Sequence, residues 1–256
     1  MKHRTLIVTT TVTGVVLAAV LAATRASAGG STPAGAGAGR SPAKVLHLDR
    51  SDWKITLPIG TKNGPTDILQ PDLDTFSINP FFTVVGNSVQ FQAPVTGMTT
   101  PNSSYPRSEL RENINWDNKV GKNTMTIDEA ITATPAVKPH VVAGQIHDAG
   151  DDVLVIRLEG SKLFVDHNGD DGPTISANYV LGTRFTVKLV ASGGQIKVFY
   201  NGTQVDDYTV PATSEGLDYF KAGAYTQANC TNSAPCDNTN VGQVDIYSLK
   251  TTHSPN

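Results

Sequence analysis

The chain has 256 residues, of which 39% are hydrophobic, and its formal net charge is −3. A net-acidic protein is not a general binder of nucleic acid or other polyanions, so an acidic partner would need basic groups gathered at one site. Once the N-terminal region is set aside, about 210 residues remain, which fits one large domain.

Residues 1–28 have the pattern of a secretory signal peptide. "MKHR" is basic, "TLIVTTTVTGVVLAAVLAA" is apolar, and "ASA" at residues 26–28 is a small-residue cleavage site. The apolar run approaches membrane-spanning length, but its threonines and the cleavage site favour a signal over an anchor. We therefore expect a secreted, extracellular protein with no membrane association after cleavage. Cleavage would remove three basic residues and no acid, which lowers the charge of −3 by three, to −6.

Residues 29–44, "GGSTPAGAGAGRSPAK", contain little that could be buried. Gly, Ala, Pro and Ser in this proportion predict a flexible linker. The folded domain is predicted to cover residues 45–256.

Alternating strands dominate this domain. Residues 88–95, "SVQFQAPV", place Val89, Phe91 and Ala93 on one face. Hairpins are predicted to turn at Glu159–Gly160 and at Gly193–Gly194, a final strand covers 241–252, and a short helix lies within 66–73. Many short strands between turn signals predict an all-β sandwich or barrel.

The two cysteines, Cys230 and Cys236, lie in "CTNSAPC". In a secreted protein, this spacing predicts a disulfide that closes a short loop. The alternative is a zinc site, but no histidine lies near the two cysteines in sequence.

Three segments carry polar residues on one face of a predicted strand. Successive side chains of a strand point to opposite faces. The residues that share the polar faces are Arg107, Glu109 and Arg111; Gln145 and His147; and Tyr219, Lys221, Gly223, Tyr225 and Gln227. A solvated sheet face also alternates, but it would mix Lys, Glu, Thr and Ser. Because these side chains are types that bind anions and transfer protons, the three segments together predict a functional site.

The motifs "RSELRE", "QIH" and "YFKAGAYTQ", in this order, resemble the signature segments of the alginate lyases of polysaccharide lyase family 7, and "WKITLPIG" at residues 53–60 resembles the opening strand of that family. The resemblance covers roughly residues 45–250. It implies a concanavalin-like jelly-roll β-sandwich of two antiparallel sheets with a concave substrate groove, and a catalytic domain at 45–256. Ala224 and the segment "NINWDN" depart from the family pattern without touching the polar faces.

The resemblance also implies the chemistry. Alginate is a chain of mannuronate and guluronate, and a lyase removes the C5 proton and expels O4. The family roles place neutralisation of the sugar carboxylate on Arg107 and Gln145, and proton transfer on His147 and Tyr225. Substrate-binding positions are predicted at Glu109, Arg111, Tyr219, Lys221 and Gln227, with Glu109 orienting the arginines. No metal or other cofactor is expected, because an arginine and an amide can neutralise the carboxylate.

The motif reads "QIH" rather than "QVH", and the isoleucine form resembles members that accept guluronate. We therefore expect a monomeric, endolytic enzyme that prefers guluronate-containing blocks. Three alternatives exist. A lyase for another polyuronate such as glucuronan is the nearest in chemistry, and a non-catalytic carbohydrate-binding β-sandwich is the non-enzyme alternative. A glycoside hydrolase is disfavoured, because Glu109 and Glu112 point to opposite faces of one strand.

Overall fold

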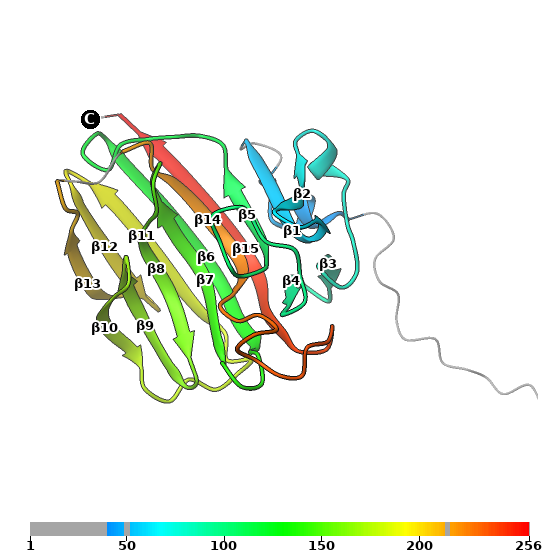
Figure 1. Cartoon of the computed structure of the whole chain (residues 1–256). Helices are drawn as coiled ribbons and strands as arrows, with labels where there is room; N and C mark the ends of the chain where they lie inside the picture. Colours follow the sequence, from blue (N-terminus) through cyan, green and yellow to red (C-terminus); the bar gives the residue numbers. More distant parts are fainter. Residues whose placement is uncertain (1–39, 49–51, 213–215, 256) are drawn as a thin grey trace, which may run out of the picture. The chain divides into compact units, whose positions relative to one another are not determined.

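The structure is a computed structural model that describes residues 40–48, 52–212 and 216–255 (Figure 1). The predicted signal peptide and residues 29–39 of the predicted linker lie outside the described residues. None of the helices in the described part is long and apolar enough to cross a membrane.

The domain begins earlier than the sequence pattern predicted. A four-residue helix, α1 (Pro42–Val45), occupies positions assigned to the linker, and Pro42 and Ala43 are buried. The side chain of Ser41 caps this helix by accepting a hydrogen bond from the backbone N–H of Lys44. Because Ala43 and Leu46 pack into the core, this short segment is part of the folded domain.

Strands form nearly all of the remaining regular structure. In chain order they are β1 (Trp53–Thr61), β2 (Gly64–Leu69), β3 (Phe82–Val85), β4 (Ser88–Pro94), β5 (Arg107–Glu112), β6 (Lys122–Ala133), β7 (His140–His147), β8 (Asp152–Glu159), β9 (Lys162–His167), β10 (Asp170–Ser176), β11 (Phe185–Ser192), β12 (Gln195–Tyr200), β13 (Thr203–Thr209), β14 (Tyr219–Thr226) and β15 (Val241–Ser254).

These strands form two antiparallel sheets over the described residues. The eight-stranded sheet has the order β10-β9-β8-β7-β14-β5-β1-β2, and the seven-stranded sheet has the order β13-β12-β11-β6-β15-β4-β3. Neighbours in each sheet are often far apart in sequence, as where β14 lies between β5 and β7 (Figure 1). The expected jelly-roll sandwich is confirmed.

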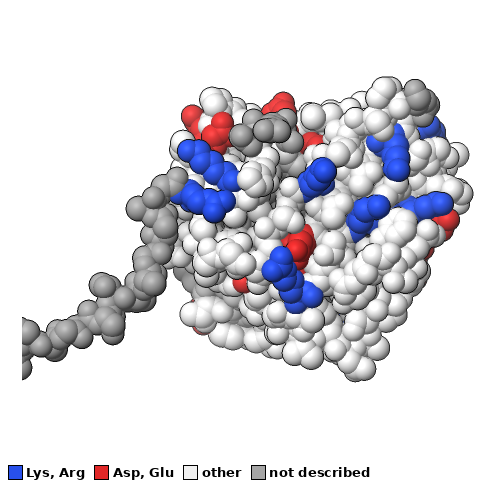
Figure 2. All heavy atoms as spheres, turned by 180° about the vertical axis from the view of Figure 1, so that it is seen from behind, with Lys and Arg blue, Asp and Glu red and all other residues white. Residues whose placement is uncertain are grey.

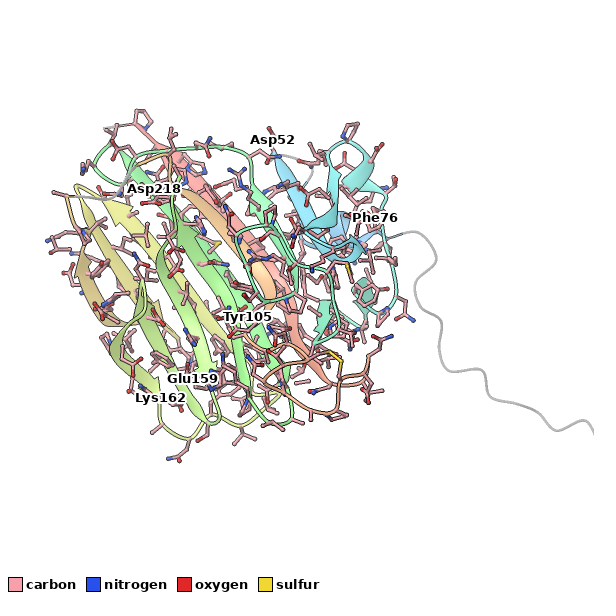
Figure 3. All side chains as sticks on the ribbon, in the orientation of Figure 1. Asp52, Phe76, Tyr105, Glu159, Lys162 and Asp218 are labelled. Atoms are coloured by element: carbon pink, nitrogen blue, oxygen red, sulfur yellow. A yellow bond between two sulfur atoms is a disulfide. The ribbon has the colours of Figure 1, made fainter. Side chains whose placement is uncertain are left out.

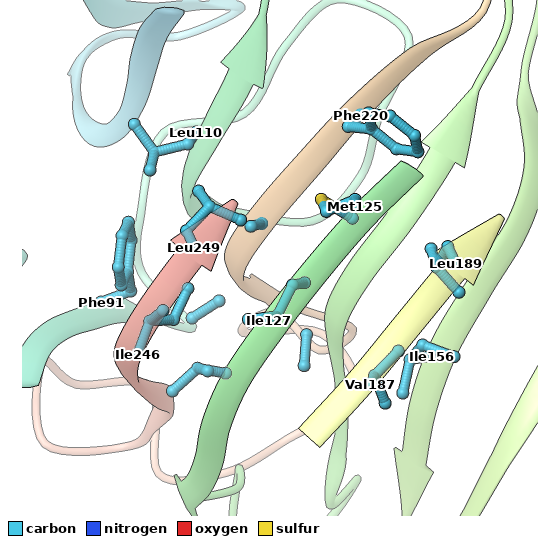
Figure 4. Close-up of a cluster of buried hydrophobic side chains, with 14 of the residues drawn as sticks. Phe91, Leu110, Met125, Ile127, Ile156, Val187, Leu189, Phe220, Ile246 and Leu249 are labelled. Carbon is cyan, nitrogen blue, oxygen red and sulfur yellow. The ribbon is translucent and has the colours of Figure 1, made fainter. Parts of the chain in front are cut away.

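The core fills the space between the two sheets. Figure 4 shows Leu110 and Phe220 of the eight-stranded sheet near Met125 and Leu249 of the seven-stranded sheet. All four belong to one cluster of buried residues. The apolar positions predicted on "SVQFQAPV" are fully buried. Burial of apolar surface on this scale is the main stabilising contribution to such a sandwich.

Both predicted hairpins occur where expected. Glu159 pairs with Lys162 at the β8–β9 turn, and Ser192 pairs with Gln195 at the β11–β12 turn. The prediction of a short helix within 66–73 is wrong for residues 66–69, because residues 64–69 form β2, which pairs with β1. Asp67 holds this register by accepting hydrogen bonds from Lys54 and Thr56 of β1. A single 3-10 turn, η2 (Asp72–Asp74), follows.

On one face of the molecule, charge alone does not mark a site. On the face shown in Figure 2, lysine and arginine side chains are spread over mostly uncharged surface, and several lie beside an acidic side chain. A concentration of basic groups has to be sought in the hollows of the fold.

Candidate active site

Two adjoining cavities of about 320 and 330 Å³ lie on the eight-stranded sheet. They share Gln145, Asp151, Asp152 and Tyr225, so they form two halves of one groove. The first half is lined by Lys54, Thr56, Thr100, Asn102, Ser103, Arg107, Arg111, Gln145, His147, Ala149, Gly150, Asp151, Asp152, Tyr219, Lys221 and Tyr225. The second half adds Val142, Val155, Arg157, Asp166, Asn168, Gly169 and Gln227.

Strand pairing brings the three polar segments together, because β14 lies between β5 and β7. Directly paired residues of neighbouring strands project their side chains to the same face. The pairs across β14 are Lys221 with Arg111 and with Gln145, Tyr225 with Arg107, and Tyr219 with His147. The floor of the groove is therefore one continuous polar surface built from β5, β7 and β14, although β5 and β14 are more than 100 residues apart in sequence.

Gly223 allows β14 to lie close to β5. Its φ is +140°, and a Cβ there would stand 2.6 Å from the carbonyl oxygen of Ser108. Only glycine fits such an approach without strain. On the other side, the pairing of β14 with β7 shifts register between Ala222 and Tyr225. A bulge of this kind redirects the following side chain, here Tyr225.

A buried ionic network lies beneath the groove floor. Nζ of Lys221 is 2.6 Å from Oε2 of Glu109, and Nη1 of Arg107 is 3.3 Å from the same oxygen. The amide nitrogen of Gln145 donates a hydrogen bond to the other carboxylate oxygen, Oε1. Glu109 thus fixes three side chains that reach the groove, each from a different strand.

This network changes the proton affinities of its members. Burial alone would raise the pKa of Glu109, but Lys221 and Arg107 together bring it below its usual value. Burial, together with the charge of Arg107, lowers the pKa of Lys221 to about 8 despite the pairing with Glu109. Glu109 is therefore an anion that balances the basic groups around it.

His147 is held in one orientation at the edge of the network. Its Nδ1 lies 2.7 Å from the carbonyl oxygen of Asp148 and 3.0 Å from the hydroxyl of Tyr219, whose ring stacks on the imidazole. A carbonyl can only accept, so Nδ1 carries the proton of the neutral ring and Nε2 is the basic nitrogen. Burial, and next the charge of Lys221, lowers the pKa of His147, which keeps it neutral near pH 7.

Tyr225 is held in place by one contact to its ring and one to its hydroxyl. The guanidinium carbon of Arg107 lies 3.9 Å from the ring centroid, and Oγ of Ser103 lies 2.7 Å from the phenolic oxygen. Arg111 stacks in the same way on Tyr219, also at 3.9 Å. These contacts place an ionisable phenol and an imidazole at the same groove.

Comparison with known proteins decides the family. The family model described as "Alginate lyase" matches residues 47–253, nearly the whole domain. The chain belongs to the alginate lyase family. An alginate lyase from Corynebacterium sp. is 47% identical, with a TM-score of 0.79 over 84% of this chain and 98% of that one. Another solved alginate lyase, of polysaccharide lyase family 7, is 45% identical, with a TM-score of 0.77 over 84% and 99%.

A more distant relative was solved as a complex with its substrate. This family 7 alginate lyase is 26% identical, with a TM-score of 0.67 over 84% of this chain and 97% of that one. The protein in the complex is a variant with one His changed to Asn and one Tyr to Phe, and the substrate is GGMG. No curated protein matches this chain.

In this alginate lyase, eight of the nine predicted site residues line the groove. Arg107, Arg111, Gln145, His147, Tyr219, Lys221 and Tyr225 line its first half, and Gln227 lines the second. Glu109 differs from the expectation that it binds substrate. It is 1% exposed, lies beneath the floor and is engaged by its neighbours. Its position fits the orienting role rather than contact with a ligand.

Sequence reasoning missed the groove residues that lie on loops. Asn102 and Ser103 precede β5, and Asp151 follows β7. Loop residues have no periodicity, so the alternation that found the floor could not find the walls. Lys54 was missed although it lies on β1, because its strand shows only one basic residue.

The predicted disulfide is confirmed, since Cys230 and Cys236 are bonded. Within the described residues, no group of three or more His, Cys, Asp or Glu side chains is arranged to hold a metal ion. The disulfide loop begins shortly after β14, and its Asn232 donates a hydrogen bond to the hydroxyl of Tyr105 on the segment that carries Ser103. Asn229, next to the bridge, donates a hydrogen bond to the carbonyl oxygen of Ser104.

Proposed function

We propose that this protein is a secreted, endolytic alginate lyase that cleaves the 4-O-glycosidic bond by β-elimination, prefers guluronate-containing blocks and releases unsaturated oligosaccharides. The observation that carries the proposal is the convergence of Arg107, Gln145, His147 and Tyr225 on one groove. Secretion is supported by the signal-like sequence of residues 1–28, and the enzyme is proposed to act as a monomer.

The first requirement of the reaction is neutralisation of the uronate carboxylate, because the C5 proton is otherwise too weak an acid. Arg107 has several N–H donors beyond the one directed at Glu109, and Nε is buried without a partner among the described residues. Gln145 keeps a second amide hydrogen after its bond to Glu109. Charge-assisted donors fixed in advance stabilise the charge that develops on the carboxylate as C5 is deprotonated.

The second requirement is a base near C5. Nε2 of neutral His147 takes the C5 proton, and the C5–H electron pair becomes the C4–C5 double bond. Since Nδ1–H is engaged with the carbonyl of Asp148, the imidazole does not need to turn before it accepts the proton. The lowered pKa of His147 keeps the ring in its basic form near neutral pH.

The third requirement is an acid at O4. As the C4–O4 bond breaks, its electron pair leaves on O4, which takes the phenolic proton of Tyr225. His147 ends protonated and Tyr225 ends as a phenolate, and exchange with solvent resets both. The relative solved with GGMG, as a variant with one His and one Tyr replaced, supports a reaction that uses these two residue types.

The remaining polar residues serve the neighbouring sugars. Arg111 and Lys221 supply positive charge in the first half of the groove, and Gln227 supplies an amide in the second. Tyr219 supports His147 and Arg111 at once. The two halves meet at Tyr225, so sugars can bind on both sides of the reacting bond, which supports internal cleavage.

The test is the ultraviolet absorbance of the new C4–C5 double bond, measured with purified protein on polyguluronate, polymannuronate and glucuronan. We expect the fastest increase on polyguluronate and a fall in viscosity before short products accumulate. A response on glucuronan alone would assign a different polyuronate, and binding without any increase in absorbance would indicate a carbohydrate-binding module.

A further inference from the structure

Ser103 touches the reacting oxygen of the proposed acid. It lies in the segment between β4 and β5, is half-buried and lines the groove. Its Oγ is 2.7 Å from the hydroxyl oxygen of Tyr225, and either oxygen can be the donor. No sequence motif marked this residue.

Two further hydrogen bonds define what the Ser103 hydroxyl can do. The backbone N–H of Tyr105 donates to Oγ at 3.0 Å, and Oγ lies 3.2 Å from the carbonyl oxygen of Tyr105, which can only accept. A serine hydroxyl has one hydrogen and two lone pairs. The Tyr105 N–H occupies one lone pair, so one hydrogen and one lone pair remain for the Tyr105 carbonyl and the Tyr225 hydroxyl.

The bonding partners are therefore set by the protonation state of Tyr225. While Tyr225 is a phenol, its hydroxyl can donate to the free lone pair of Ser103, with the serine hydrogen on the carbonyl of Tyr105. When the phenol turns its hydrogen to O4, the serine hydrogen is free to turn to the phenolic oxygen. Once Tyr225 is a phenolate it can only accept, and the serine hydrogen rotates onto it. In both protonation states of Tyr225 the serine hydrogen has an acceptor, and the exchange needs no movement of heavy atoms.

We propose that Ser103 is a positioning residue that holds Tyr225 and stabilises the phenolate formed when Tyr225 gives its proton to O4. This inference rests on the proposed function, because it requires Tyr225 to change protonation state in the reaction. The charge on Tyr225 grows during bond cleavage, so the serine bond is stronger in the transition state than in the ground state and accelerates the chemical step.

The loop that carries Ser103 is anchored on both sides of the residue. Its backbone N–H donates to the carbonyl of Thr100, and the carbonyl of Ser104 accepts from Asn229. The ammonium of Lys138 donates to the hydroxyl of Tyr105 at 2.8 Å, and Figure 3 shows Tyr105 on this loop. Because the loop is held by its neighbours, removal of the Ser103 hydroxyl should leave the loop in place.

The experiment compares wild type with Ser103→Ala, Ser103→Thr and Ser104→Ala. Ser104 is the matched control, since it is exposed and its hydroxyl has no hydrogen-bond partner in the described part of the chain. We expect Ser103→Ala to lower kcat by about 10- to 100-fold, the range for a hydrogen bond to a charged group, with KM nearly unchanged. Ser103→Thr keeps the hydroxyl and should retain most of the wild-type kcat.

The outcomes separate this inference from the proposed function. If wild type produces no unsaturated product on any polyuronate, the function itself fails. If wild type is active and Ser103→Ala keeps full kcat, loses only affinity, or loses no more than Ser104→Ala, the role of Ser103 is wrong. Equal melting temperatures of the four proteins show that each difference in kcat arises in the folded enzyme.

Discussion

Nζ of Lys221 lies 2.6 Å from the carboxylate of Glu109, and the two residues are only 6% and 1% exposed. Glu109 also engages Arg107 and Gln145, so one buried anion orients the groups that would meet the substrate carboxylate. A buried charge that loses its partner is costly, whereas an exposed pair contributes little.

Glu109→Gln should therefore damage both stability and turnover. The amide keeps the shape but leaves Lys221 and Arg107 without a counter-charge, which should cost about 3–5 kcal/mol. For a domain of this size, that corresponds to a fall in Tm of about 6–20 °C. Thermal unfolding followed by circular dichroism checks it. The control is Asp171→Asn, which breaks the exposed pair with Lys162. If both variants melt like wild type, Glu109 does not organise the site.

Arg107 should be irreplaceable by lysine. Its guanidinium contacts Glu109 and lies over the ring of Tyr225, and a lysine has no planar group to do both. Loss of one preorganised donor typically costs about 10²–10³ in turnover, so Arg107→Ala should lose at least that and Arg107→Lys should regain little. Arg184→Lys is the matched control, because Arg184 also pairs with a carboxylate and stacks on a tyrosine but is not among the groove residues. Near-normal initial rates for Arg107→Lys would reject this picture.

Alternation in the sequence was enough to find the groove floor. On β5 and β14 it separated Arg107, Arg111 and Lys221 from the core residues Leu110 and Phe220, which are fully buried. It treated the polar face as an outer face, however. Alternation reports which side of a strand a residue occupies and not the curvature of the sheet, so it could not show that Lys221 would be almost completely buried.

Contacts between segments that are distant in sequence could not be predicted from the sequence. Ser103 meets Tyr225 across 122 positions, and His253 of β15 bonds to Glu112 of β5, joining the two sheets. Such contacts depend on loop conformation and on strand order, which no local pattern encodes. The bulge before Tyr225 is also a product of pairing with β7.

Glu129 is an acid inside the sandwich. It lies on β6, and neither carboxylate oxygen has a hydrogen-bond partner among the described residues. Burial, and next the charge of Asp128, raises the pKa of Glu129 to about 8. The native state therefore binds this proton at pH values where the unfolded chain has released it, so the stabilisation is complete below about pH 4.5 and is lost as pH rises through 8.

Glu129→Gln should remove this dependence, because an amide does not titrate. Wild-type stability should fall by about 1.4 kcal/mol per pH unit over part of the range between these two values. Urea unfolding at pH 5 and pH 8 measures the difference, which should be clearly smaller in the variant. Glu159→Gln, at a half-buried site where the carboxylate pairs with Arg157, should keep the wild-type difference. An unchanged pH dependence in Glu129→Gln would show that Glu129 is not held as a neutral acid.

The disulfide should matter for turnover as well as for stability. The bonded cysteines are six positions apart, and the chain-entropy account gives such a short loop about 2–3 kcal/mol. Cys230→Ser/Cys236→Ser should lower Tm by about 4–12 °C. It should also lower kcat, since Asn229, next to the bridge, holds the backbone beside Ser103. Melting temperature and initial rates together check this, and a variant equal to wild type in both would show that the loop does not support Tyr225.

Because guluronate and mannuronate differ in stereochemistry, we expect His147 and Tyr225 to contribute differently to the cleavage of each. In guluronate the C5 proton and O4 lie on opposite sides of the ring, so base and acid must approach from two directions. His147 on β7 and Tyr225 on β14 reach the groove from different strands. In mannuronate the two groups lie on the same side, where Tyr225 can act as both base and acid.

His147→Ala should therefore harm turnover of polyguluronate more than turnover of polymannuronate, and Tyr225→Phe should abolish both. The reason is that only the guluronate reaction needs a base on the side away from O4, whereas both reactions need the phenol at O4. Initial rates of ultraviolet absorbance increase on the two homopolymers give the ratio directly, and His140→Ala, at the opposite end of β7, controls for loss of a histidine from that strand. Equal losses for His147→Ala on the two polymers would contradict the two-direction mechanism, and a wild-type enzyme active only on polymannuronate would contradict the proposed preference.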